Sequence, residues 1–279
     1  MLRRAVLMIA VGLAAPALEA RAPADTTRTV YVSAVDRKGE PVTDLTAGDL
    51  VVKENGQVRE ITSLSRATER NHVAVLVDDG GEGRMDMPVA ELLNAASGRA
   101  AFSISMLNPQ AIVLNDYTTD QATLQRSISR LVQRGRLQRD LNVLSDAVAW
   151  TARGMRQRKL SRPVIVILTN AGDSQDREIS RGILEELRSS RAALHVVRVV
   201  GADISPVLAD GPKQSGGSET ISTSTRGFAE AMMAIPRTLA YQYELTYVLP
   251  DGVKPNERLQ ITTTRPNLRI IAPTRIPDR

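Results

Sequence analysis

The sequence predicts an α/β protein in which a doubly wound, mostly parallel sheet is inserted into a small antiparallel β-sandwich formed by the N- and C-terminal segments. Three continuous apolar runs rich in β-branched residues are typical of strands buried on both faces of a parallel sheet: residues 73–77, 164–168 and 194–200. Helical patterns separate these runs, and such alternation implies right-handed βαβ crossovers. Both ends of the chain instead alternate apolar and polar residues, as antiparallel strands do.

The first 22 residues have the pattern of a secretory signal peptide. Two arginines, Arg3 and Arg4, precede an apolar run over residues 5–15, and small residues follow at Ala20 and Ala22. This run is short for a membrane span, which needs about 20 residues. We therefore expect residues 1–22 to be removed, leaving a protein without a membrane span that is secreted, periplasmic or held in the cell envelope. An uncleaved N-terminal anchor is the alternative.

The two end segments are expected to share one sandwich. Residues 28–66 form its first part, in which the pair Asn55-Gly56 between two apolar runs is the strongest short-range signal of a hairpin. Residues 241–279 form its second part, where a tyrosine stripe (Tyr241, Tyr243 and Tyr247) is expected to pack inside rather than face a partner. Each segment alone has too few strands to bury a face, so the two must combine.

Residues 71–240 are expected to form the α/β domain. The turn Asn108-Pro109 divides residues 102–114 into a strand pair with one antiparallel edge. Apolar residues at helical spacing mark the buried faces of three helices, including Ile179 on the third, and Trp150 is expected in the core.

The composition excludes two kinds of site. The chain has no cysteine, so disulfides and thiolate metal sites are impossible. The net charge is +5, but the arginines are scattered and aromatic residues make up only 3% of the chain, whereas a nucleic-acid surface needs a basic stripe with stacking aromatics. We expect solvated helix faces and no nucleic-acid partner.

Several motifs occur in a fixed order along the chain. Near the N-terminus stands VSAVDRKGEPVTDLTAGDLVVKENGQ; the core contains HVAVLVDD, LNVLSDAV and VIVILTNAGD; SGG (215–217) and LAYQYELTY (239–247) follow. Their order and spacing resemble the bacterial von Willebrand factor type A (VWFA)-related domain proteins over nearly the whole mature chain. The resemblance implies a Rossmann-like fold with a metal-ion-dependent adhesion site (MIDAS) at the carboxyl ends of the parallel strands, where open α/β sheets generally bind ligands.

The family pattern for this site is Asp-x-Ser-x-Ser on the first loop, a threonine on the second and an aspartate on the third. In this sequence Asp78 matches the first aspartate, but Gly80 and Glu82 stand where the serines belong, Asn142 replaces the threonine and Asn170 the last aspartate. Glycine offers no side-chain oxygen for Mg²⁺, and an amide oxygen is a weaker ligand than a carboxylate. We expect a degenerate site without a metal or other cofactor; the alternative is that Asp78 and Glu82 together hold a cation.

We predict an exported, non-catalytic protein-binding module of the adhesion or scaffold type. Its partner, a protein of unknown identity, is expected to bind a surface that we call the loop face: Asp78, Asp79, Glu82, Asn142, Asn170 and Asp173. The alternatives are a Mg²⁺- or Mn²⁺-dependent adhesin with an altered metal site and a structural subunit of an envelope assembly.

Catalysis is not expected, and no catalytic residue is assigned. A hydrolytic triad needs a base beside an activated serine, and no Gly-x-Ser-x-Gly motif occurs in the sequence. The two histidines, His72 and His195, lie at or within apolar strands and are interpreted as structural. Asp176 and Glu178 are interpreted as the cap and first turn of a helix.

Overall fold

The computed structural model describes residues 26–81, 83–107, 110–131, 143–201 and 203–278, so the predicted signal peptide lies outside the described residues. Its central sheet has six strands in the order β10-β9-β8-β5-β6-β7. All neighbours are parallel except β6 and β7, which confirms the predicted antiparallel edge. The strands are β5 (Asn71–Asp78), β6 (Ala100–Met106), β7 (Ile112–Thr118), β8 (Pro163–Thr169), β9 (Ala193–Val199) and β10 (Glu219–Ser222).

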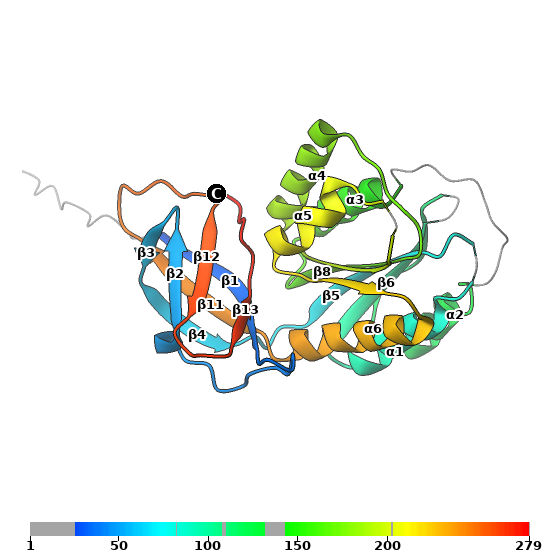
Figure 1. The fold of residues 1–279 in the computed structure, drawn as a ribbon, viewed down its shortest axis with the longest axis horizontal. Coiled ribbons are helices and arrows are strands. Elements are labelled where there is room, and N and C mark those ends of the chain that lie inside the picture. Colours follow the sequence, from blue (N-terminus) through cyan, green and yellow to red (C-terminus); the bar gives the residue numbers. More distant parts are fainter. Residues whose placement is uncertain (1–25, 82, 108–109, 132–142, 202, 279) are drawn as a thin grey trace, which may run out of the picture.

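Helices cover both faces of this sheet (Figure 1). On one face lie α1 (Asp86–Ala95), α2 (Gln121–Ile128) and α6 (Thr225–Ala240), and on the other α3 (Val143–Gln157), α4 (Arg177–Ser190) and α5 (Pro206–Ser215). Successive residues of β5 enter different cores: Val73 and Val75 pack with α1 and α6, whereas Ala74 and Leu76 pack with α3 and α4. The sheet is therefore buried on both sides, as its continuous apolar runs predicted.

The two ends of the chain form the predicted sandwich. One sheet has the order β13-β1-β11-β4 and the other the order β12-β2-β3, and they share one apolar core. Both hairpin residues have the positive φ that such turns require, 50° at Asn55 and 77° at Gly56. The strands are β1 (Thr26–Val35), β2 (Leu50–Glu54), β3 (Gln57–Arg59), β4 (Ile61–Arg66), β11 (Tyr243–Leu249), β12 (Leu259–Thr263) and β13 (Arg269–Ile271), and a 3-10 turn, η1 (Ala47–Asp49), precedes β2.

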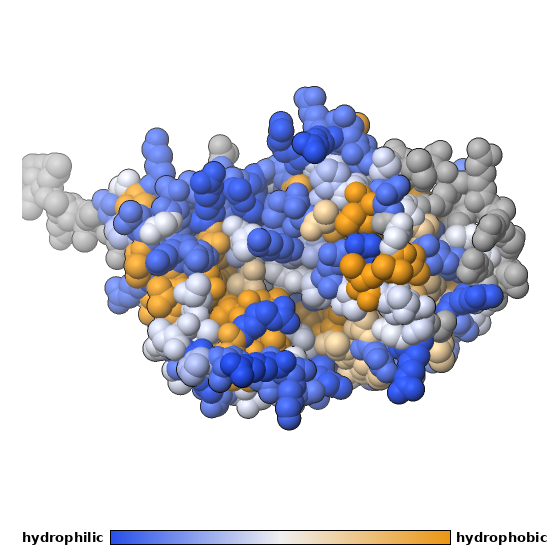
Figure 2. Space-filling view, viewed as in Figure 1, coloured by the Kyte–Doolittle hydropathy of each residue, from blue (hydrophilic) through white to orange (hydrophobic). Residues whose placement is uncertain are grey.

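Two predicted core residues are instead exposed. Trp150 is 55% exposed because α3 buries the opposite side of the helix, which carries Val148 and Ala152. Ile179 is 53% exposed in the first turn of α4, because the buried side of this helix carries Ser180, Ile183, Leu187 and Ser190. On the face seen in Figure 2, apolar residues gather between α5 and α6.

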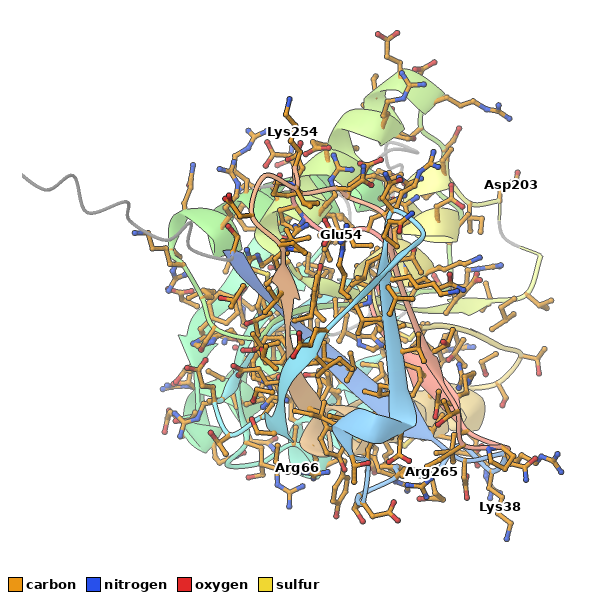
Figure 3. All side chains as sticks on the ribbon, turned by 90° about the vertical axis from the view of Figure 1, so that its left-hand side faces the viewer. Lys38, Glu54, Arg66, Asp203, Lys254 and Arg265 are labelled. Atoms are coloured by element: carbon orange, nitrogen blue, oxygen red, sulfur yellow. The ribbon has the colours of Figure 1, made fainter. Side chains whose placement is uncertain are left out.

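The tyrosine stripe is divided between inside and outside. Tyr243 and Tyr247 are buried in the sandwich, as predicted, whereas Tyr241 is exposed at the end of α6. The guanidinium of Arg66 lies 4.8 Å from the Tyr241 ring centre, a cation–π contact. Tyr247 donates a hydrogen bond of 2.6 Å to Glu54, a buried carboxylate inside the sandwich (Figure 3).

His195 lies in the middle of β9 and is almost completely buried. Its Nδ1 is 2.9 Å from the hydroxyl of Ser218, and within the described residues its Nε2 has no hydrogen-bond partner. Burial disfavours the charged ring and lowers the pKa of His195 to about 4. The histidine is therefore structural, and it is neutral at physiological pH.

This burial predicts a pH-dependent loss of stability. The pKa of His195 is lower in the folded protein than its value of about 6.5 in unfolded chains. The neutral His195 ring therefore contributes its full share of the stability above pH 6.5, and this share is lost as the pH falls toward 4. The free energy of unfolding should drop by about 2 kcal/mol between pH 7 and pH 5. Urea denaturation of the wild type and of His195→Asn, which lacks the titrating ring, measures this difference. Equal pH dependence in both proteins would contradict the prediction.

Candidate functional site

The predicted loop face lies where the central strands end. Asp78 is the last residue of β5, Asp79 follows it, and Asn170 and Asp173 lie in the loop between β8 and α4. Since β5 and β8 are parallel neighbours with Asp78 opposite Thr169, these two loops meet at one edge of the sheet. Glu82 and Asn142 lie outside the described residues.

The carboxylates of Asp78 and Asp79 are turned inward. Both residues are buried. Asp79 accepts hydrogen bonds from the backbone N–H groups of Gly81 (2.8 Å) and Gly83 (2.7 Å), one on each oxygen, and Asp78 accepts one from Gly80 N–H (3.3 Å). Such bonds satisfy charged oxygens that burial would otherwise leave unpaired. These side chains therefore hold the β5–α1 loop in its conformation.

Asn170 joins the two loops. Its backbone N–H donates to the carbonyl of Asp78 (3.1 Å), and its side-chain Nδ2 donates to the carbonyl of Asp79 (2.9 Å). The side-chain oxygen faces Gly80: a Cβ at that position would lie 3.3 Å from it. Gly80 also has a φ of +62°, which favours glycine. The conformation of this loop thus favours glycine at position 80, where the family pattern has serine.

Asp173 of the predicted loop face belongs to a second buried group, whose two serines were not predicted from the sequence. The hydroxyl of Ser145, in the first turn of α3, donates to Asp173 Oδ2 (2.5 Å) and lies 2.8 Å from the hydroxyl of Ser205. All three residues are buried, and the backbone N–H of Asp173 donates to the carbonyl of Asp203 (2.8 Å). The three segments that carry these residues are thereby tied together. The one local signal was the Ser205-Pro206 pair, because serine before proline is typical of a helix start.

The loop face offers few oxygen ligands for a magnesium ion. Mg²⁺ needs near-octahedral oxygen ligands. Gly80 supplies no side-chain oxygen, Asp79 accepts a loop N–H on each of its carboxylate oxygens, and Asn170 offers only an amide oxygen, because its Nδ2 donates to the Asp79 carbonyl. Across the part of the chain that the structure describes, no group of three His, Asp or Glu side chains is arranged to hold a metal ion. Glu82 and Asn142, the other two residues expected at this site, lie outside the described residues.

Exposed apolar side chains lie at the same end of the central sheet as these inward-facing groups. We call them the apolar rim: Met87, Ile112, Val113, Ile179 and Val200. Each lies at the end of the sheet that carries the loop face, because α1 and α4 begin there, β7 starts opposite the last residue of β6, and Val200 follows β9 directly. Single exposed apolar residues are common on protein surfaces, so the apolar rim by itself does not define a contact surface.

Sequence comparisons do not identify a family: no protein-family model matches, and no curated protein matches either. Among solved structures the chain is similar to the von Willebrand factor type A protein from Catenulispora acidiphila (12% identity, TM-score 0.48, 92% of this chain and 74% of that one). It is also similar to the SpRpn10 VWA domain (12%, 0.43, 58% and 93%) and to the TFIIH p34 N-terminal domain (12%, 0.48, 60% and 97%). Solved von Willebrand factor type A domains are thus among its structural neighbours, at low sequence identity. No helix within the described ranges is long and apolar enough to cross a membrane.

Proposed function

We propose that this chain is an exported, non-catalytic protein-binding module that contacts its partner through the loop face without a metal ion. The observation that carries this proposal is the contrast at this end of the sheet: the carboxylates of the loop face are buried, and the side chains of the apolar rim are exposed. A surface of this kind binds by burying apolar area, which contributes about 25 cal/mol for each Å² removed from water. A fold of the von Willebrand factor type A kind also suggests a protein-interaction module.

The contacts of the histidines support a non-catalytic role. A general base works best with a pKa near the operating pH and must reach a substrate. His195 has a serine hydroxyl 2.9 Å away, which the sequence had not indicated, but its ring is buried and its pKa is lowered to about 4. His72 has its Nδ1 2.9 Å from the carbonyl of Ser161, a structural contact at the start of β5.

Metal independence can be tested by thermal unfolding. A cation that binds only the folded protein stabilises it by about 2.7 kcal/mol when its free concentration is 100 times Kd. Because Gly80 offers no side-chain oxygen and Asn170 only an amide oxygen, we expect millimolar Mg²⁺ or Mn²⁺ to leave the Tm of the purified protein unchanged relative to EDTA. A rise in Tm that is abolished by Asp78→Ala would favour the metal-dependent adhesin instead, with Glu82 completing the site.

Partner binding can be tested with two matched surface variants and an envelope extract of the native host. The first carries Met87→Ser, Ile179→Ser and Val200→Ser on the apolar rim, and the second carries Val58→Ser and Trp150→Ser, which are exposed elsewhere. In EDTA, we expect the wild type and the control variant to capture a protein from the extract, and we expect the rim variant not to capture it. Loss in the control alone, reproduced by Val58→Ser on strand β3 and not by Trp150→Ser on α3, would favour a structural subunit that uses the sandwich. Loss of capture in EDTA would favour the adhesin.

A further inference from the structure

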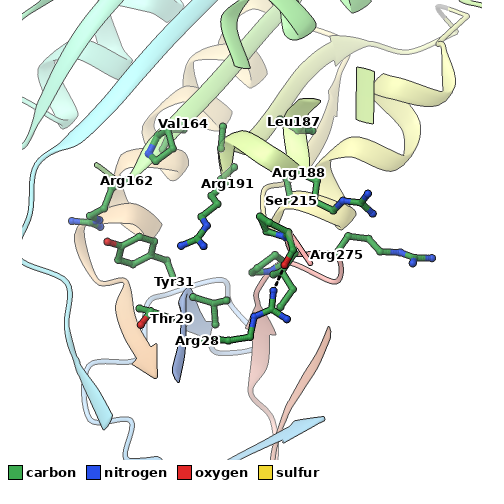
Figure 4. A pocket seen from close by; sticks show the side chains of 18 of the residues that line it. Arg28, Thr29, Tyr31, Arg162, Val164, Leu187, Arg188, Arg191, Ser215 and Arg275 are labelled. Atoms are coloured by element: carbon green, nitrogen blue, oxygen red, sulfur yellow. Dashed lines mark hydrogen bonds between the residues drawn. The ribbon is translucent and has the colours of Figure 1, made fainter. Parts of the chain in front are cut away.

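A cavity of about 330 Å³ lies between the sandwich and the opposite edge of the central sheet, away from the loop face (Figure 4). Strand β1 forms one wall, the starts of β8 and β9 with the end of α4 form another, and residues 273–277 close it. This volume is within the range of small-molecule sites, which are about 300–1,000 Å³ and often lie between domains. The cavity belongs to neither the loop face nor the apolar rim.

Five arginines line the cavity: Arg28, Arg162, Arg188, Arg191 and Arg275. Among the described residues, no aspartate or glutamate lines it. Three of the arginines have carboxylate partners just outside the lining. Arg28 pairs with Glu54 at 2.9 Å, and Arg188 and Arg275 both pair with Glu257. Arg162 and Arg191 form no ion pair within the described part of the chain, although Glu69 and Glu244 lie close enough to Arg162 to act on it electrostatically.

The two unpaired arginines differ in their other contacts. Arg162 is buried and donates to the carbonyl oxygens of Glu69 (2.5 Å) and Leu239 (2.8 Å) and to the side chain of Gln242 (3.0 Å). It therefore has a structural role in joining the sandwich to the central sheet. The guanidinium of Arg191 has no such partners, and Figure 4 shows this side chain extending from the end of α4 toward β1.

Arg191 also has a backbone conformation that arginine rarely adopts. It caps α4 with a φ of +58°, a position where glycine or asparagine is usual. A larger residue in this left-handed region is strained, and such strain commonly coincides with functional sites. Lys159 (φ 50°) and Arg162 (φ 42°) share this conformation, so the backbone alone does not mark a site. What sets Arg191 apart is that its exposed guanidinium lines the cavity and forms no ion pair with the described residues.

We propose that this cavity binds a small organic anion, with a carboxylate or phosphate group held by Arg191. A guanidinium donates two parallel hydrogen bonds to either group, and these charge-assisted bonds are stronger than neutral ones. Val164, Leu187 and Ile276 supply apolar surface for the body of the ligand. A bound anion would contact both the sandwich and the α/β domain, so it should stabilise the two together.

The test is isothermal titration calorimetry of the purified full chain with octanoate and octyl phosphate, and with 1-octanol as the neutral control. We expect an anionic probe to bind, octanol to bind at least about tenfold more weakly, and Arg191→Gln to weaken anion binding by at least about tenfold. Arg181→Gln, an exposed change on the same helix, should bind as the wild type does. Which of the two anions binds more tightly distinguishes a carboxylate from a phosphate ligand.

A Tm for each variant equal to or above that of the wild type shows that the fold is intact. Arg191→Gly is a second variant that removes the guanidinium, and glycine suits the positive φ at this position. Three results would overturn the proposal: no anion binds at millimolar concentration, octanol binds as tightly as the anions, or the Arg191 variants bind like the wild type. Because the cavity and the loop face lie at opposite edges of the sheet, loss of anion binding should leave partner capture unchanged.

Discussion

Replacing Glu54 with alanine is expected to lower the free energy of unfolding by about 3–5 kcal/mol, the usual cost of removing one partner of a buried ion pair. The Glu54 carboxylate accepts hydrogen bonds from Arg28 (2.9 Å), from the Tyr247 hydroxyl (2.6 Å) and from the backbone N–H of Asn256 (2.6 Å). Alanine would leave the Arg28 guanidinium, whose side chain is only 10% exposed, without its counter-charge. Chemical denaturation measures this loss.

An exposed ion pair supplies the matched control. Arg237 and Glu40 are 2.9 Å apart with side chains 53% and 55% exposed, and solvent screens such pairs strongly. Glu40→Ala should therefore change the free energy of unfolding by less than about 1 kcal/mol. Similar small effects in the Glu40 and Glu54 variants would mean that water reaches the Glu54 carboxylate and that the pair is not a buried one.

The fold could be predicted from the sequence because its signals are local. The hairpin follows from Asn55-Gly56, and the buried strands follow from continuous β-branched runs such as residues 164–168. The same local patterns failed for Trp150 and Ile179, because the burial of a single helical residue depends on how the helix is rotated against the sheet. That rotation is set by contacts between α3, α4 and the strands, which no one segment encodes.

The candidate site was harder to predict for the same reason. The loops that carry Asp78 and Asn170 follow from strand order, because parallel neighbours end at the same edge. The direction of each side chain does not follow from strand order. Asp79 accepts hydrogen bonds from glycine N–H groups within its own loop, and Asp173 accepts one from Ser145, which is 28 residues away in the sequence. The arginine cavity combines β1, α4 and residues 273–277, so it depends entirely on how the sandwich meets the sheet.

One motif acquires a physical explanation only in three dimensions. The SGG segment begins where α5 ends, and Gly216 caps this helix with a φ of +79°. The next residue, Gly217, lies against the backbone of Leu194 in the central strand β9: a Cβ at Gly217 would be 1.9 Å from the carbonyl oxygen of Leu194. This contact is between two backbone segments, so no flexible side chain can move aside.

Gly217→Ala is therefore expected to lower the free energy of unfolding by about 3 kcal/mol or more, at the upper end of the cost of overpacking. Gly154→Ala is the matched control, because Gly154 lies inside α3 with no atom within 4 Å of the added methyl group. Alanine there should raise the stability by about 0.5–1 kcal/mol through its better helix propensity. Chemical denaturation of both variants should give effects of opposite sign. A neutral Gly217→Ala variant would show that the 216–218 segment can move away from β9.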